Sequence, residues 1–157
     1  MYKPRIAHTH LKVRDLRGAV DFYSSFLKLK VTEIVADRYA FLSGGSSHHE
    51  IALQQVGANA PQPPRFSTGL YHVAFEVPDK KSFALAYQNL TETDVSIYLV
   101  DHLISWAMYF SDPDGNGLEI YVDTRKESDG RDLWHGENLP LDRETILATL
   151  NNSNCIN

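Results

Sequence analysis

The sequence predicts an α+β fold made of two paired βαβββ modules. The first observation is an internal repeat, in which His8 and Asp15 recur 64 positions later as His72 and Asp79. The second is the hydrophobic spacing within each copy, which changes from two residues to about 3.6 and back to two. This change is typical of a strand, then a helix, then further strands. Because there are only two copies, we expect a paired module rather than an open array of repeats.

The whole chain, 1–157, is predicted to be one domain, because its length and its hydrophobic content of 43% suit a single compact core. Its expected parts are module one at about 5–55, a linker at 56–68, module two at about 69–123 and a tail at 124–157. The linker contains Pro61, Pro63 and Pro64, which exclude regular structure there.

Module one is expected to begin with a strand over Ile6–Val13, followed by a helix that Asp15 caps. The apolar positions of this helix fall at helical spacing: Leu16, Ala19, Val20, Tyr23 and Phe26. Three short strands should follow, near Val31–Val35, Tyr39–Leu42 and Glu50–Gln54.

Module two is expected to repeat this order, with a strand over Leu70–Val77 and a helix from Asp79 to about Leu90. Its three later strands should lie near Ser96–Val100, Ser105–Phe110 and Leu118–Val122. The turn Asp112–Asn116 before the last strand is rich in residues that tolerate tight geometry. In the tail, a short helix is predicted over Arg143–Leu150, behind a cap at Asp142.

Composition excludes several classes of function. The net charge is −5 and the basic residues are scattered, so a nucleic-acid partner is not expected. No segment approaches 18 consecutive apolar residues and the N-terminal residues do not form a signal peptide, which predicts a cytoplasmic protein with no membrane partner. Cys155 is the one cysteine, which excludes an internal disulfide and a cysteine metal site.

A homodimer is expected from the surfaces that such a fold would leave open. The edge strands of a half-open sheet need covering, as do the apolar positions Ile146, Leu147 and Leu150 of the tail helix.

The repeat also predicts a divalent metal site. His8 and His72 stand at the same position of the two first strands, and Glu119 stands on the last strand of module two. Two neutral imidazoles and one carboxylate are ligands that divalent first-row metals favour, and they leave coordination positions open. A lone histidine on a strand is more often structural, but two histidines kept in register favour metal ligation. His10 has Ala74 as its counterpart, and we expect it to line a pocket or to be structural.

Three segments, AHTHLKVRDLRGAVDFY, GLYHVAFEVPD and YFSDPDGNGLEIYVD, together resemble the glyoxalase, bleomycin-resistance and extradiol-dioxygenase family, the vicinal oxygen chelate (VOC) superfamily. The resemblance covers residues 5–123. It implies that His8, His72 and Glu119 hold the metal inside a cavity formed by a curved, half-open eight-stranded mixed sheet from both modules.

Further matches favour the catechol 2,3-dioxygenase branch of that family. The stretch from His48 through Glu50 to Leu53 is similar to the segment that carries the acid/base histidine of those enzymes, and His102 and Tyr109 resemble their substrate-side His and Tyr. The resemblance implies an extradiol ring-cleaving enzyme that uses Fe(II), a small aromatic diol and O2. His49 would move a catechol proton, while His102 and Tyr109 would hydrogen-bond oxygen atoms during the reaction. Mn(II), Ni(II) and Zn(II) are the alternative metals.

Two other kinds of function stay open. One is a glyoxalase-type lyase or isomerase, or a thiol transferase, on the same fold. Glu50 can be aligned with Glu119 in the repeat, and the resemblance implies that glyoxalases use a carboxylate there as a fourth ligand. Adjacent residues on a regular strand face opposite ways, so His49 and Glu50 should not both face the metal. A small-molecule-binding resistance protein is the third possibility, and it would not need the metal triad.

Overall fold

The computed structural model describes residues 2–64 and 66–151 and divides the chain into two compact units. Unit 1 comprises Met1–Gly69 and Asp112–Asn116, and unit 2 comprises Leu70–Ser111 and Gly117–Asn157. Cys155 lies outside the described residues. None of the helices in the described ranges is long and apolar enough to cross a membrane.

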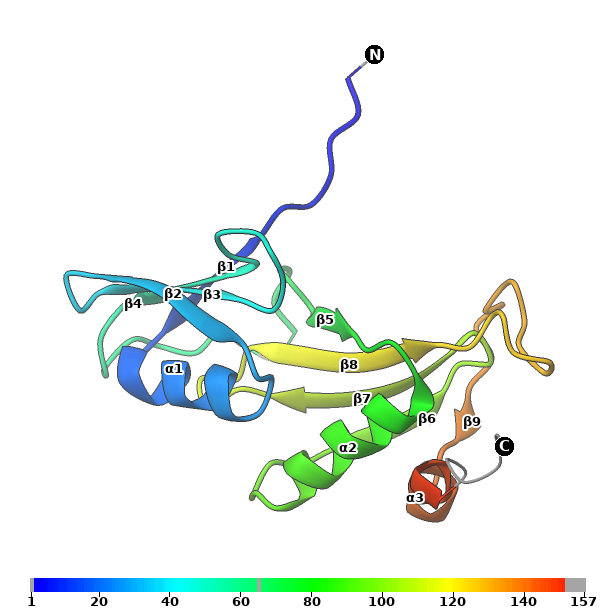
Figure 1. The fold of residues 1–157 in the computed structure, drawn as a ribbon. Helices are drawn as coiled ribbons and strands as arrows, with labels where there is room; N and C mark the ends of the chain where they lie inside the picture. The colour runs from blue at the N-terminus through cyan, green and yellow to red at the C-terminus, as the bar shows by residue number, and fades with distance from the viewer. Residues whose placement is uncertain (1, 65, 152–157) are drawn as a thin grey trace. The chain divides into compact units, whose positions relative to one another are not determined.

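Unit 1 contains one helix packed on a four-stranded sheet (Figure 1). Its elements are β1 (Thr9–Val13), α1 (Leu16–Ser25), β2 (Lys30–Val35), β3 (Tyr39–Ser43) and β4 (Ile51–Gln55). The strand order is β1-β4-β3-β2, with β1 parallel to β4 and the other pairs antiparallel. Helix α1 contacts β3 and β4, so its buried side chains form the core of this unit with the sheet.

Unit 2 has the same connectivity, extended at its C-terminal end (Figure 1). Its elements are β5 (Val73–Glu76), α2 (Lys80–Thr91), β6 (Tyr98–Asp101), β7 (Ser105–Ser111), β8 (Gly117–Asp123), β9 (Leu139–Pro140) and α3 (Arg143–Asn151). The strand order is β5-β8-β7-β6-β9, and β5 is parallel to β8.

The repeated βαβββ order and the α+β class are confirmed, with two open sheets of four and five strands. Equivalent aspartates cap the helix in both units. Asp15 accepts a hydrogen bond from the Arg17 amide at 3.1 Å and caps α1, whereas Asp79 accepts one from the Ser82 amide at 2.6 Å and caps α2.

Two predicted strands begin later than expected. β1 begins at Thr9 rather than Ile6, and β5 begins at Val73 rather than Leu70. The reason is pairing, because Thr9 lies opposite Ile51 at the start of β4, and Val73 lies opposite Leu118 near the start of β8. Among the described residues, those just before these points have no partner strand.

The tail contains a strand that was not predicted and a helix that was. β9 pairs with β6 at the sheet edge, where a proline is tolerated because it needs no ladder hydrogen bond. α3 begins behind Asp142, which accepts a hydrogen bond from the Thr145 amide at 2.7 Å. Ile146 is fully buried and α3 packs on α2, so this residue needs no second chain to cover it.

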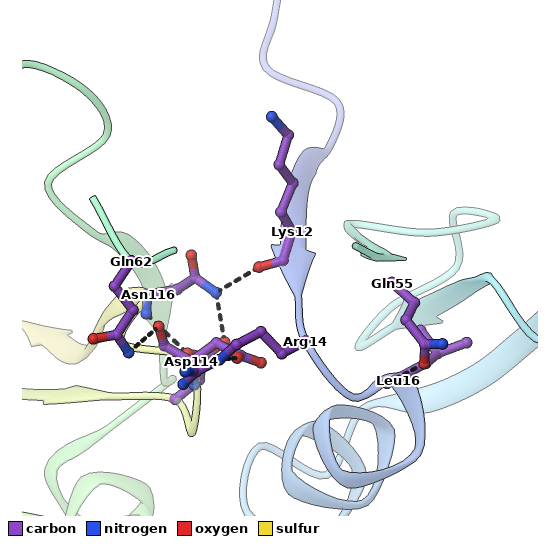
Figure 2. Close-up of polar contacts among 8 residues, drawn as sticks. Lys12, Arg14, Leu16, Gln55, Gln62, Asp114 and Asn116 are labelled. Carbon is purple, nitrogen blue, oxygen red and sulfur yellow. Dashed lines mark hydrogen bonds and ion pairs between the residues drawn. The ribbon is translucent and has the colours of Figure 1, made fainter. Parts of the chain in front are cut away.

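The turn Asp112–Asn116 is held by a network of hydrogen bonds within unit 1 (Figure 2). The buried Asp112 carboxylate accepts from the amides of Asp114 and Asn116 at 2.9 and 2.8 Å, and from the Tyr23 hydroxyl at 3.0 Å. Asp114 accepts from Arg14 at 2.7 Å. Burial and the neighbouring Asp112 raise the pKa of Tyr23 far above its ordinary value, so its hydroxyl keeps the hydrogen that it donates.

Replacing Tyr23 with phenylalanine should therefore lower the free energy of unfolding by about 1–3 kcal/mol, because a buried carboxylate loses a donor. Urea denaturation of the full chain measures this loss. The matched control is Tyr87→Phe at the equivalent position of α2, since Tyr87 is also buried but its hydroxyl bonds no other described residue. Equal losses in the two variants would contradict the role given to the Tyr23–Asp112 bond.

Candidate functional site

The parallel pairing of β5 with β8 brings His72 beside Glu119. His72 directly precedes β5, and Glu119 lies on β8 opposite Ala74. His72 Nε2 is 2.9 Å from Glu119 Oε2, and the Glu119 side chain is buried. His72 Nδ1 is also buried and has no hydrogen-bond partner among the described residues. This imidazole is therefore only half satisfied by the protein.

Gly117 allows the close approach of the two segments. A Cβ at this position would lie 2.2 Å from the Tyr71 carbonyl oxygen and 3.4 Å from His72 Cα. No side chain fits against a backbone atom at that distance. The absence of a side chain at the start of β8 thus permits the contact that places His72 near Glu119.

Tyr109 on β7 and His102, in the turn between β6 and β7, extend this group. Tyr109 lies opposite Glu119 in the β7–β8 ladder, and its ring centroid is 5.4 Å from that of His72. The Tyr109 hydroxyl is 2.9 Å from His102 Nε2. Burial and the Glu119 carboxylate raise the pKa of Tyr109 well above its ordinary value, so the phenol stays protonated. Four of the predicted site residues, His72, Glu119, Tyr109 and His102, therefore form one connected group inside unit 2.

Two residues of the tail also belong to this group, and the sequence interpretation missed both. His102 Nδ1 is 2.5 Å from Asn138 Oδ1, and the His102 ring meets the Trp134 ring edge-on at a centroid distance of 5.6 Å. No motif in the sequence marks these positions. The one signal in the sequence is that Trp134 and Asn138 stand in a polar stretch. A tryptophan in such a stretch suggests a contact with another part of the protein.

Unit 1 brings the other two predicted site residues together. The ring centroids of His8 and His49 are 4.6 Å apart, and Phe41 packs on His49 at 4.9 Å. Desolvation of the ring, together with the neighbouring His8 and His48, lowers the pKa of His49 below its ordinary value. His49 is therefore a neutral base at neutral pH. His10 is exposed, with its ring 6.3 Å from that of Tyr39.

The strand registers correct the alignment of Glu50 with Glu119. Within unit 2, Glu119 lies opposite Ala74 on β5 and opposite Tyr109 on β7. The equivalent residue of unit 1 lies opposite His10 on β1 and opposite Phe41 on β3, and that residue is Ala52. Sequence letters alone favoured Glu50 because both glutamates precede an isoleucine. The side chain of an alanine has no atom that can bind a metal.

The Glu50 carboxylate is used inside its own turn. It accepts hydrogen bonds from the Ser47 hydroxyl and from the Gly44 amide, the latter at 3.0 Å. The hydrogen bond from Ser47 is the main reason that the pKa of Glu50 lies below its ordinary value. His49 and Glu50 both precede β4, which begins at Ile51, so strand alternation does not govern where they point.

The donor atoms of unit 2 fit a divalent metal. An imidazole nitrogen and a carboxylate oxygen face each other at hydrogen-bond distance, and the second ring nitrogen is buried with no partner in the described part of the chain. Within residues 2–64 and 66–151 the structure assembles no group of three His, Cys, Asp or Glu side chains that could hold a metal. His8 belongs to unit 1, whereas His72 and Glu119 belong to unit 2, and the triad stays a prediction.

The family of the chain follows from comparison with known proteins. The model of the Glyoxalase/Bleomycin resistance protein/Dioxygenase superfamily matches residues 5–120. This chain belongs to that superfamily, as its repeated modules and strand registers indicate.

Curated relatives come from two kinds of enzyme. A catechol-2,3-dioxygenase of Bacillus subtilis is 35% identical over 127 residues, which are 81% of this chain and 44% of the relative. A biphenyl-2,3-diol 1,2-dioxygenase of Rhodococcus globerulus is 30% identical over 144 residues, with 88% and 74% covered. The metallothiol transferase FosB of Staphylococcus epidermidis is 32% identical over 126 residues, with 78% and 84% covered. The chain thus spans less than half the length of the Bacillus dioxygenase.

Among solved structures, a glyoxylase/bleomycin resistance protein/dioxygenase domain from Frankia superposes with a TM-score of 0.65 at 23% identity, covering 81% of this chain and 96% of that one. This similarity agrees with the fold described above.

Proposed function

We propose that this protein is an extradiol ring-cleaving dioxygenase, which uses Fe(II) held by His8, His72 and Glu119 to cleave a small catechol-like diol with O2. The observation that carries the proposal is the connected group in unit 2, where the His72–Glu119 pair is continued by Tyr109 and His102. The relatives named as catechol and biphenyl-diol dioxygenases support the same reaction class.

Each protein group has a distinct part in this proposal. Bound Fe(II) would supply the route by which electrons pass from a bound catecholate to dioxygen. His49, neutral at neutral pH, would accept a proton from a catechol hydroxyl and later return it. Tyr109 and His102 would hydrogen-bond oxygen atoms of the substrate and stabilise the charge that develops on them.

A metal-dependent thiol transferase is the second candidate, favoured by the similarity to FosB. A glyoxalase-type enzyme with a fourth carboxylate ligand has less support, because the counterpart of Glu119 is Ala52 and the Glu50 carboxylate already bonds Gly44 and Ser47. A resistance protein that only binds a small molecule would not explain the His72–Glu119 pair.

Anaerobic loading with Fe(II), metal analysis and an oxygen electrode test the proposal. We expect one iron per chain and oxygen uptake with at least one member of a panel of catechols. Glu119→Gln should weaken iron binding by more than the roughly 10- to 100-fold that loss of an outer hydrogen-bond partner costs. Glu76→Gln is the control, since Glu76 lies on the neighbouring strand β5 and bonds Tyr121 instead. Thiol transfer without oxygen uptake would overturn the assignment in favour of the second candidate.

The variants His49→Ala and Glu50→Gln distinguish ring cleavage from a glyoxalase-type mechanism with a fourth carboxylate ligand. For ring cleavage, His49→Ala should lower kcat by about 10²- to 10⁴-fold with iron content unchanged, because a positioned acid/base group is lost. Glu50→Gln should leave iron content unchanged, and His135→Ala, an exposed histidine, serves as the control for both. Loss of metal in Glu50→Gln, with little effect of His49→Ala, would indicate a fourth carboxylate ligand.

We also propose that the protein forms a homodimer, because the edge strands of both open sheets have a neighbouring strand on only one side within the described residues. Sedimentation equilibrium should give twice the chain mass. A single-chain mass at high protein concentration would refute the dimer and would leave the catalytic proposal untouched.

A further inference from the structure

The segment between β8 and α3 reaches the Tyr109–His102 pair through a chain of hydrogen bonds. Tyr109 bonds His102 Nε2 at 2.9 Å, and His102 Nδ1 bonds Asn138 Oδ1 at 2.5 Å. Trp134 Nε1 is 3.1 Å from the same Asn138 Oδ1 and 2.7 Å from the Glu137 carbonyl oxygen. All of these residues lie in unit 2.

The chemistry of these groups determines which one donates in each hydrogen bond. The Asn138 atom that faces Trp134 is the amide oxygen, which shares the indole hydrogen with the Glu137 carbonyl oxygen. That oxygen can only accept, so neutral His102 must present a hydrogen on Nδ1. Its Nε2 is then an acceptor, and the hydrogen between His102 and Tyr109 comes from the phenol.

We propose that Asn138 and Trp134 are positioning residues, which hold neutral His102 as the Nδ1–H tautomer and so make Tyr109 donate its hydroxyl hydrogen to His102. Trp134 orients the Asn138 amide and packs edge-on against the His102 ring, while Asn138 selects the tautomer. The role in catalysis rests on the proposed function, but the tautomer itself is a property of this chain.

The assignment changes what Tyr109 can offer to a substrate. Glu119 also faces the Tyr109 phenol and can only accept, so two acceptors compete for one hydrogen. With neutral Nδ1–H His102, this hydrogen goes to Nε2 at 2.9 Å, and the Tyr109 oxygen can accept a hydrogen bond. When both ring nitrogens of His102 carry hydrogens, Nε2 donates to Tyr109, and the phenol hydrogen can go to the Glu119 carboxylate or to a substrate oxygen. Through the tautomer of neutral His102, the tail would decide whether Tyr109 donates its hydrogen to His102 or accepts one from it.

The test is long-range ¹H–¹⁵N correlation on protein labelled at the imidazole nitrogens, at a pH where the His102 signals report the neutral ring. Of the 7 histidines, His102 is assigned by the signal that disappears in His102→Gln. We expect the ¹⁵N shifts of a protonated Nδ1 and an unprotonated Nε2. Asn138→Leu should move His102 toward the Nε2–H form, and Asn138→Asp, which retains an acceptor oxygen, should keep Nδ1–H. Trp134→Phe should shift the tautomer in the same direction as Asn138→Leu.

Glu137→Gln is the control within the same segment, because the Glu137 side chain bonds Arg131 at 2.8 Å and does not touch His102. An Nε2–H tautomer in the unmodified protein, or a tautomer that Asn138→Leu leaves unchanged, would overturn the inference. If the protein cleaves catechols, Asn138→Leu should also lower kcat roughly 10- to 100-fold with iron content unchanged. The NMR result does not depend on metal or turnover, so failure of the proposed function and failure of this inference are distinguishable.

Discussion

The parallel pairing of the first and last strands within each module is the interaction on which the rest of the structure depends. Parallel strands need a long crossover connection, which α1 with β2 and β3 supplies in unit 1 and α2 with β6 and β7 supplies in unit 2. In unit 2 this pairing places the residue before β5 next to the middle of β8, and those residues are His72 and Glu119. Gly117 permits the approach because any side chain there would meet the Tyr71 carbonyl. The candidate site is therefore a direct product of strand register.

Most of the fold could be predicted because each element expected in one module can be compared with its counterpart in the other. A cap at Asp15 is credible when Asp79 stands at the same place of a second copy, and both aspartates do cap helices. Strand starts were less predictable, since Ile6 and Leu70 are apolar like the strands that they precede but lie outside the paired stretches. The alignment of Glu50 with Glu119 failed for a related reason. Similarity of residue types does not determine strand register, whereas hydrogen-bonded pairing does. The pairing places Ala52 at the position in unit 1 that Glu119 has in unit 2.

The site residues differ in how far sequence could reach them. His72, Glu119, Tyr109 and His102 were predicted from the repeat and the family resemblance, and the structure connects all four within unit 2. Asn138 and Trp134 escaped because they lie in an irregular segment, and only tertiary contacts show that they reach His102. The protonation states give these residues different roles, since Tyr109 keeps a proton that it can donate to His102, and neutral His49 can accept a proton at neutral pH.

The central claim is that the His72–Glu119 pair is part of a three-ligand iron site completed by His8, with no fourth carboxylate. A crystal structure of the Fe(II)-loaded protein, grown without oxygen, tests it most directly. We predict one iron bonded to His72, Glu119 and a His8 side chain at about 2.0–2.2 Å, with Glu50 bonded to its own turn. A Glu50 oxygen at bonding distance from the metal, or a metal bound without His72 and Glu119, would contradict the account.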